Sequence, residues 1–179
     1  MVDLLLGKIT LQLILGVSSQ KSIREAQELI VEMQHQNVSL EVYKPAFIQQ
    51  LKTTLCHLAL LNAFPGPQTP LQPERLHCLS TLFCDELFIG IVQRPCAYLQ
   101  HYLLVALLHC QLKPQAFHLN HFLELHSQAV FTQESPLLPF VTLLFTQFDF
   151  QASHKELSGL TLKGDLLLED RLGEITKEA

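Results

Sequence analysis

Apolar residues recur every three to four positions along most of the chain, and runs that alternate apolar with polar residues are scarce. This spacing is typical of helices that bury one face, because a half-buried strand would alternate with a period of two. The first such segment covers residues 2–17, where Leu5, Leu6, Ile9, Leu13 and Val17 share one side. The pattern predicts an all-α fold.

Local signals indicate where several of these helices begin and end. Ser22 and Glu25 have the spacing of a capping box, in which a hydroxyl and a carboxylate bind free backbone N–H groups at a helix start. We expect that helix to end near Asn37, because asparagine tolerates the left-handed conformation of a C-terminal cap. Pro45 suits the first turn of the next helix, which is predicted to continue to about Ala63.

Prolines at positions 65, 67, 70 and 73 exclude a helix across residues 64–73, because each removes a backbone donor. Residues 74–93 then read as one helix or two, broken near Cys84 or Gly90. Further helices, each with a proline at or near its first turn, are predicted over 95–111, 115–126 and 136–148.

Helices of this length joined by short loops favour antiparallel helical hairpins that form a bundle or a short α-solenoid. We assign residues 1–148 to this helical domain, with the proline-rich loop 64–73 inside it. Acidic residues outnumber basic ones in residues 149–179, for which we expect a charged, partly disordered tail. A short amphipathic helix in that tail is the alternative.

Charged residues make up only 16% of the chain and apolar residues 48%, and many neutral glutamines lie beside the apolar stretches. An average domain is about 25% charged, so removing water from this weakly charged exterior costs comparatively little free energy. Such an exterior suits burial against other protein subunits. The net charge of -5 and the lack of a basic stripe exclude nucleic acid as a partner. The longest apolar run is too short to span a bilayer, so we expect membrane association only indirectly, through partners.

The five cysteines form no C-x-x-C pair and lie in apolar segments, which indicates reduced, buried thiols in a cytoplasmic protein. The N-terminal apolar run has an acid at position 3 and is interrupted at Lys8, unlike a signal peptide.

Residues 99–126 contain five histidines and one cysteine, which raises the question of a metal site. His118 and His121 have the i, i+3 spacing that lets two helical side chains reach one ion. The further ligands that this pair would need are too distant or on other faces: Cys110, Glu124 and His126. We therefore expect no metal, and a helical hairpin that turns near Pro114.

No catalytic motif is present in the sequence. Adjacent residues on a helix point in different directions, so neither Asp85 with Glu86 nor Cys56 with His57 has the geometry of a catalytic pair. We expect no enzyme and no cofactor.

Three short motifs resemble a known family. Gln100, His101 and Tyr102 open an apolar helix, Phe122 and His126 bound a short helix, and residues 135–138 form a Ser-Pro-Leu-Leu opening into a leucine-rich helix. These stretches resemble the C-terminal helical domain of the colon-cancer-associated Mic-like family, the regulatory subunit of the late-endosomal Rab exchange-factor complex. Members of that family carry a β-propeller before the helices, so by this resemblance the chain is a fragment, a short isoform or a separate relative.

The resemblance implies a non-enzymatic scaffold or adaptor subunit that supports a Rab exchange-factor heterodimer in endosome–lysosome trafficking and autophagy. It implies a cytoplasmic location, peripheral on late endosomes or lysosomes. The residues that would contact the partner are those of the first two motifs: Gln100, His101, Tyr102, Phe122 and His126. The alternative function is a helical bundle that binds a lipid or other apolar small molecule in a cavity lined by Phe83, Phe88, Phe117 and Phe122.

Overall fold

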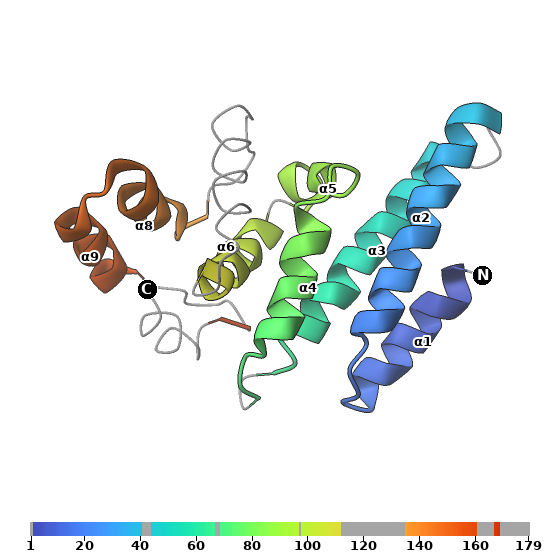
Figure 1. The fold of residues 1–179 in the computed structure, drawn as a ribbon, viewed down its shortest axis with the longest axis horizontal. Coiled ribbons are helices and arrows are strands. Elements are labelled where there is room, and N and C mark those ends of the chain that lie inside the picture. The colour runs from blue at the N-terminus through green and yellow to red at the C-terminus, as the bar shows by residue number, and fades with distance from the viewer. Residues whose placement is uncertain are drawn as a thin grey trace.

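The computed structural model describes residues 2–40, 44–66, 69–96, 98–111, 135–160 and 167–168. Within these ranges the chain forms helices and no strand, so the predicted all-α class is confirmed (Figure 1). The α-helices are α1 (Val2–Ile14), α2 (Gln20–Leu40), α3 (Pro45–Ala63), α4 (Pro73–Phe83), α5 (Ile89–Gln93), α6 (Leu99–Gln111), α8 (Leu138–Thr142) and α9 (Phe150–Gly159). A π-helix, η1 (Leu143–Gln147), continues α8.

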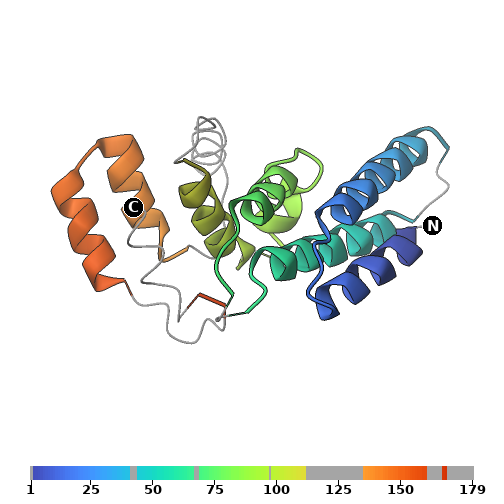
Figure 2. The same cartoon turned by 60° about the horizontal axis from the view of Figure 1, so that its bottom comes forward.

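The helices are arranged as an elongated array. Helices α1 and α2 lie at one end, α3 packs against α1, α2 and α4, and α4 packs against α6. Helices α8 and α9 pack against each other and against η1 at the opposite end of the molecule (Figures 1 and 2). Successive helices from α1 to α4 alternate in direction in Figure 1.

The core lies along α3, α4 and α6, and α6 is apolar around most of its circumference. Leu55 and Ala59 of α3, Leu79 of α4 and Leu103 of α6 are almost completely buried. A helix that is apolar on nearly every side must be covered on nearly every side, and these three have neighbours on several faces.

Helix α2 begins earlier than the capping-box pattern predicts. It begins at Gln20, and the backbone N–H of Ile23 donates to the carbonyl of Ser19 at 2.9 Å. Ser22 therefore lies inside the first turn, and the predicted start at Ser22 is wrong. The helix also continues past Asn37 to Leu40. The chain contains serines at both 19 and 22, and burial of Ser19 against Asn62 selects the earlier one.

Helix α1 ends at Ile14 and not at Val17, because Gly16 forms a C-terminal cap. Gly16 has a φ of 68°, its N–H donates to Leu13 at 3.1 Å, and the N–H of Val17 donates to Gln12 at 2.9 Å. This pair of bonds is the Schellman motif, which glycine favours since it has no Cβ.

Several predicted boundaries are confirmed, and others shift by a few residues. Helix α3 covers the predicted range, and of the alternatives left open for residues 74–93, two helices with a break at Cys84 are the one that forms. Helix α6 begins at Leu99 and not at Pro95, while the predicted helix over 136–148 is replaced by α8 and η1. The helix predicted over 115–126 lies outside the described residues.

The helices extend beyond residue 148, where we expected the tail to begin. Asp149 is the N-cap of α9, and its Oδ1 accepts from the N–H of Ala152 at 2.9 Å. Asp149 thus has a structural role that the charge pattern did not indicate. The rest of the tail, except residues 160, 167 and 168, lies outside the described residues.

Candidate functional site

The outer side of α1 carries a row of exposed aliphatic residues at the end of the array. Helix α1 buries Val2, Leu6 and Ile9. Its opposite side exposes Leu4 by 79%, Leu11 by 57%, Ile14 by 76% and Leu15 by 66%. We call these four residues the α1 stripe. At 3.6 residues per turn the four fall on one side of the helix, with exposed Gly7 and Lys8 between Leu4 and Leu11. Exposed aliphatic residues grouped on one side in this way mark an interaction site.

The exposed side of α1 was not predicted from the sequence, although a signal for it was present. The predicted apolar side includes Leu5, Leu6, Ile9, Leu13 and Val17. The helix has apolar residues on the other side as well, and the second set is the one left exposed. A helix that is apolar on both sides has more apolar surface than neighbours on one side can cover.

Gly7 lies in the middle of the α1 stripe and is exposed. A Cβ added there would meet no atom of the described residues within 4 Å. The packing of the chain itself therefore does not require glycine, which destabilises a helix interior by about 1 kcal/mol relative to alanine. Its effect is to leave the backbone of α1 accessible to a close neighbour.

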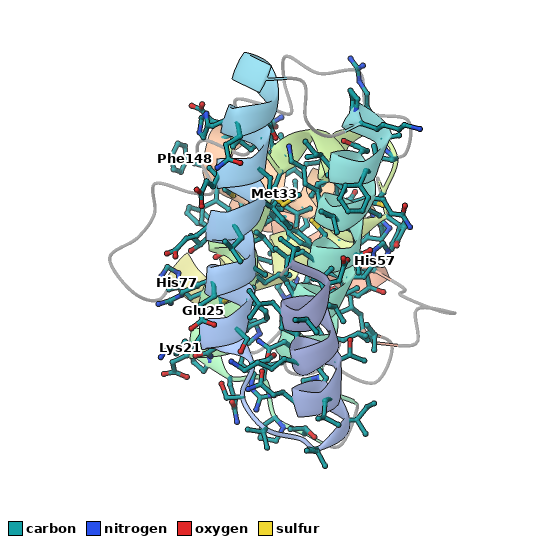
Figure 3. The ribbon with its side chains drawn as sticks, turned by 90° about the vertical axis from the view of Figure 1, so that its right-hand side faces the viewer. Lys21, Glu25, Met33, His57, His77 and Phe148 are labelled. Carbon is teal, nitrogen blue, oxygen red and sulfur yellow. The ribbon has the colours of Figure 1, made fainter. Side chains whose placement is uncertain are left out.

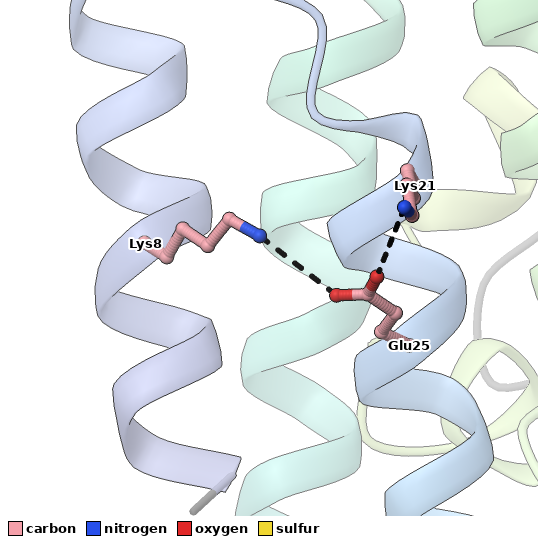
Figure 4. A network of polar contacts seen from close by, with 3 residues as sticks. All are labelled: Lys8, Lys21 and Glu25. Atoms are coloured by element: carbon pink, nitrogen blue, oxygen red, sulfur yellow. Dashed lines mark ion pairs between the residues drawn. The ribbon is translucent and has the colours of Figure 1, made fainter.

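Charged groups border one side of the α1 stripe. The Glu25 carboxylate lies 3.8 Å from Lys8 Nζ and 3.9 Å from Lys21 Nζ (Figure 4). Figure 3, viewed toward the α1 end, shows Lys21 and Glu25 one turn apart on α2. Lys8 of α1 and Lys21 of α2 thus share one carboxylate, and these exposed ion pairs tie the two helices together only weakly.

A groove of about 570 Å³ lies next to the α1 stripe, between the turn that follows α1, the last turn of α3 and the first turn of α4. We call it the loop-end groove. It is lined by Leu13, Ile14, Gly16, Val17, Leu61, Phe64, Pro65, Gly66, Thr69, Arg75 and Leu167. Its lining is mostly apolar, and among the described residues Arg75 is the charged residue that lines it.

Gln100 and Tyr102, two of the predicted partner-binding residues, are buried inside the chain. The Gln100 amide donates to the carbonyl of Val92 at 3.4 Å, which joins α6 to α5. The Tyr102 ring packs edge-to-face on Phe64, with centroids 5.4 Å apart. His101 is partly exposed. These contacts give Gln100 and Tyr102 an internal packing role, and the predicted binding role of the triplet stays a prediction.

The remaining predicted residues are divided between the core and the undescribed segments. Phe122 and His126, as well as His118, His121 and Phe117, lie outside the described residues. Phe83 and Phe88, predicted to line a lipid cavity, are completely buried in the core. Within the described ranges, no three His, Cys, Asp or Glu side chains are grouped so as to hold a metal ion.

Cys56 and His57 are adjacent in sequence but point to different environments. Burial raises the pKa of the Cys56 thiol to about 12, with a smaller contribution from Cys96. His57 lies near the surface, where Nδ1 contacts the Thr53 carbonyl at 2.7 Å and Nε2 contacts the Tyr98 hydroxyl. A thiol with such a raised pKa stays protonated at neutral pH and is a poor nucleophile.

Lys52 is a buried cation that ties α3 to the segment between α4 and α5. Its Nζ donates to the carbonyl of Leu87 at 2.8 Å and lies 5.6 Å from the ring centroid of Phe88. The Asp85 carboxylate accepts from Gln27 Nε2 at 3.0 Å and from the N–H of Leu87 at 2.9 Å. Burial lowers the pKa of Lys52, and the charge of Asp85 opposes that shift. Because these groups bind one another, the cluster stabilises the fold and is not an open site.

Comparison with known proteins adds no relative from which a function could be transferred. No known protein family, characterised protein or solved structure matches this chain. Among the described residues, no helix is both long and apolar enough to cross a membrane. The α1 stripe and the loop-end groove are therefore the features on which a function can be argued.

Proposed function

We propose that this chain is a non-enzymatic helical subunit that binds another protein through the α1 stripe. The observation that carries the proposal is the exposure of Leu4, Leu11, Ile14 and Leu15 on one side of a helix at the end of the array. Covering such a surface removes apolar area from water, which favours association by about 25 cal/mol per Å² before the costs of binding.

The position of Gly7 favours a partner that packs closely on α1, such as another helix. A glycine inside a helix is costly, and here no described neighbour fills the space above it. A partner that packs directly on the α1 backbone between Leu4 and Leu11 would use that space.

The setting of this proposal comes from the family resemblance. The partner would be a protein subunit such as the Rab exchange-factor heterodimer of late endosomes, and the chain would act as its scaffold or adaptor in lysosomal trafficking and autophagy. It would be cytoplasmic and would reach membranes only through that partner.

The test compares the wild-type chain with the variant Leu4→Ser/Leu11→Ser/Leu15→Ser. Each chain is mixed with the purified exchange-factor heterodimer, and co-migration is measured by size-exclusion chromatography with light scattering. We expect the wild type to bind and the triple variant to lose at least about 100-fold in affinity. Burial of one leucine side chain contributes about 1.5–3 kcal/mol, and 100-fold in Kd corresponds to about 2.8 kcal/mol.

The matched control is Lys155→Ser/Glu156→Ser, which changes two exposed polar residues of α9, at the opposite end of the array, without altering the net charge. It should bind like the wild type. Gly7→Ala should raise the stability of the chain by up to about 1 kcal/mol yet weaken binding, which separates folding from docking. A wild-type chain that stays monomeric and does not co-migrate with the heterodimer would overturn the proposal.

A further inference from the structure

We infer that the loop-end groove binds an extended segment of a partner polypeptide, with two aliphatic side chains against its apolar walls and an Asp or Glu carboxylate on Arg75. The groove is a different surface from the α1 stripe and shares only Ile14 with it. The groove would therefore form a second contact with a partner, and this contact would include a charged residue as well as apolar ones.

The walls of the groove offer aliphatic surface from two sides. Ile14 and Val17 come from the end of α1, and Leu61 comes from the last turn of α3; all three are about half exposed or more. Phe64 is completely buried beside them. Gly16 has an open space where a Cβ would be. The groove thus has an apolar lining that is still accessible from outside.

Arg75 is poorly explained by the needs of its own helix. It lies in the first turn of α4, where the helix dipole makes a positive charge unfavourable. Its Nη1 donates to the carbonyl of Asn62 at 3.3 Å, a long bond. Its Nε is buried and, within the described part of the chain, has no hydrogen-bond acceptor; none of the ion pairs there involves Arg75.

A carboxylate is the group that best satisfies this guanidinium. The bond to Asn62 uses Nη1, and the buried Nε cannot be reached from the groove, which leaves Nη2 as the donor for a ligand. A guanidinium N–H forms a stronger hydrogen bond with a carboxylate than with a neutral acceptor, because both groups are charged.

The shape of the groove favours a polypeptide over a lipid or a small molecule. Its volume of about 570 Å³ is large enough for several side chains, but it is open to solvent along one side. Small-molecule sites enclose roughly 70–90% of their ligand, whereas an extended segment needs only its alternate side chains covered. The single cation among apolar walls then selects an acidic residue flanked by aliphatic ones.

The experiment uses the full chain and a phage-displayed library of random 12-residue peptides. Enriched peptides are synthesised, and their Kd is measured by fluorescence anisotropy. We expect enrichment of peptides with Asp or Glu next to two aliphatic residues. Replacing that acid by its amide should weaken binding to the wild type roughly tenfold or more, since a charge-assisted pair is lost.

Arg75→Gln provides the decisive comparison. This variant should bind the acidic peptide and its amide form equally, because the group that distinguishes them is gone. Leu61→Ser, an exposed position in the wall, should weaken both peptides. Leu4→Ser, in the α1 stripe but outside the groove, should weaken neither, and thermal melts should show that all variants fold.

Three outcomes would overturn the inference: no enriched peptide, enriched peptides without an acid preference, or an acid preference that Arg75→Gln leaves intact. Palmitate is tested in parallel, and Arg75-dependent binding of palmitate without peptide binding would assign the groove to lipids instead. The two proposals can fail separately, because the triple variant Leu4→Ser/Leu11→Ser/Leu15→Ser tests the α1 stripe while Arg75→Gln tests the groove.

Discussion

Helices α3 and α9 show how differently two helices of one chain can be held in place. Helix α3 has 19 residues and buries ten of them, from Ile48 to Ala63. Helix α9 has 10 residues and buries one, the polar Ser153. Burial of apolar side chains is the main favourable term in folding, so α3 is stabilised by its neighbours whereas α9 depends on local interactions.

The local interactions of α9 are visible at its start. Asp149 caps the helix, and Phe148 before it adopts the left-handed conformation with a φ of 54°. That conformation is unfavourable by about 1–2 kcal/mol for a residue with a Cβ. Phe148 and Phe150 are also exposed. The α8–α9 end should therefore open at a lower free energy than the α1–α6 part.

The largest effect is expected from truncating the α3 core. Leu55→Ala should lower the free energy of unfolding by about 2–5 kcal/mol, because Leu55 is completely buried and leaves a cavity. Leu157→Ala in α9, which removes the same atoms from a partly buried position, should cost about 1 kcal/mol. Urea unfolding followed by circular dichroism measures both. Equal losses would remove the distinction between the two regions.

The next effect concerns the Lys52 cluster. Lys52→Met should lower the free energy of unfolding by about 1–3 kcal/mol, because the carbonyl of Leu87 loses its donor. Lys44→Met, at an exposed lysine just before α3, is the control and should change stability by less than about 0.5 kcal/mol. Amide exchange should show the loss over residues 85–88 first. If Lys52→Met leaves the free energy of unfolding unchanged, packing alone holds residues 85–88 in place.

A pH dependence should distinguish the buried thiol of α3. The pKa of Cys56 is 9.0 without the fold and about 12 within it, so its contribution to stability is complete below pH 9. Above pH 9 the unfolded chain releases the proton first, and stability falls by up to about 1.4 kcal/mol per pH unit. Cys56→Ala should show a shallower fall between pH 9 and 11 in urea titrations. If the wild type and Cys56→Ala lose stability in parallel as the pH rises, other titratable groups dominate the pH dependence.

The smallest effect is expected at the cap of α9. Asp149→Ala should destabilise α9 by about 1 kcal/mol, since the N–H of Ala152 loses its acceptor. Asp149→Ser, which restores an acceptor, should recover most of that loss. Amide exchange of residues 151–159 localises the effect, and global urea unfolding should hardly change. A comparable loss in α3 would show that the two ends are one cooperative unit.

Much of the fold could be predicted because its signals are local. The period of the apolar residues predicts helices, and proline at position 45 predicts the start of α3. The sequence left open whether residues 74–93 form one helix or two, and the break at Cys84 was one of the alternatives. The start of α2 was not, because Ser19 and Ser22 are equivalent as local caps and a contact with Asn62, distant in sequence, distinguishes them.

The candidate sites were less predictable, since exposure depends on what each helix packs against. Gln100 and Tyr102 have the polar and aromatic character of interface residues, yet they are used inside the array. The reverse holds for Leu4 and Leu11, which look like core residues and are exposed.

By itself, the sequence determined the helical class, most helix ranges and a chain with too few charges for its apolar content. These properties follow from the spacing and chemistry of neighbouring residues. Only the tertiary structure decided which of the two apolar sides of α1 is covered, and that Arg75 faces a groove without a partner charge among the described residues. Both depend on which helices meet, and that choice is made by contacts between residues far apart in the chain.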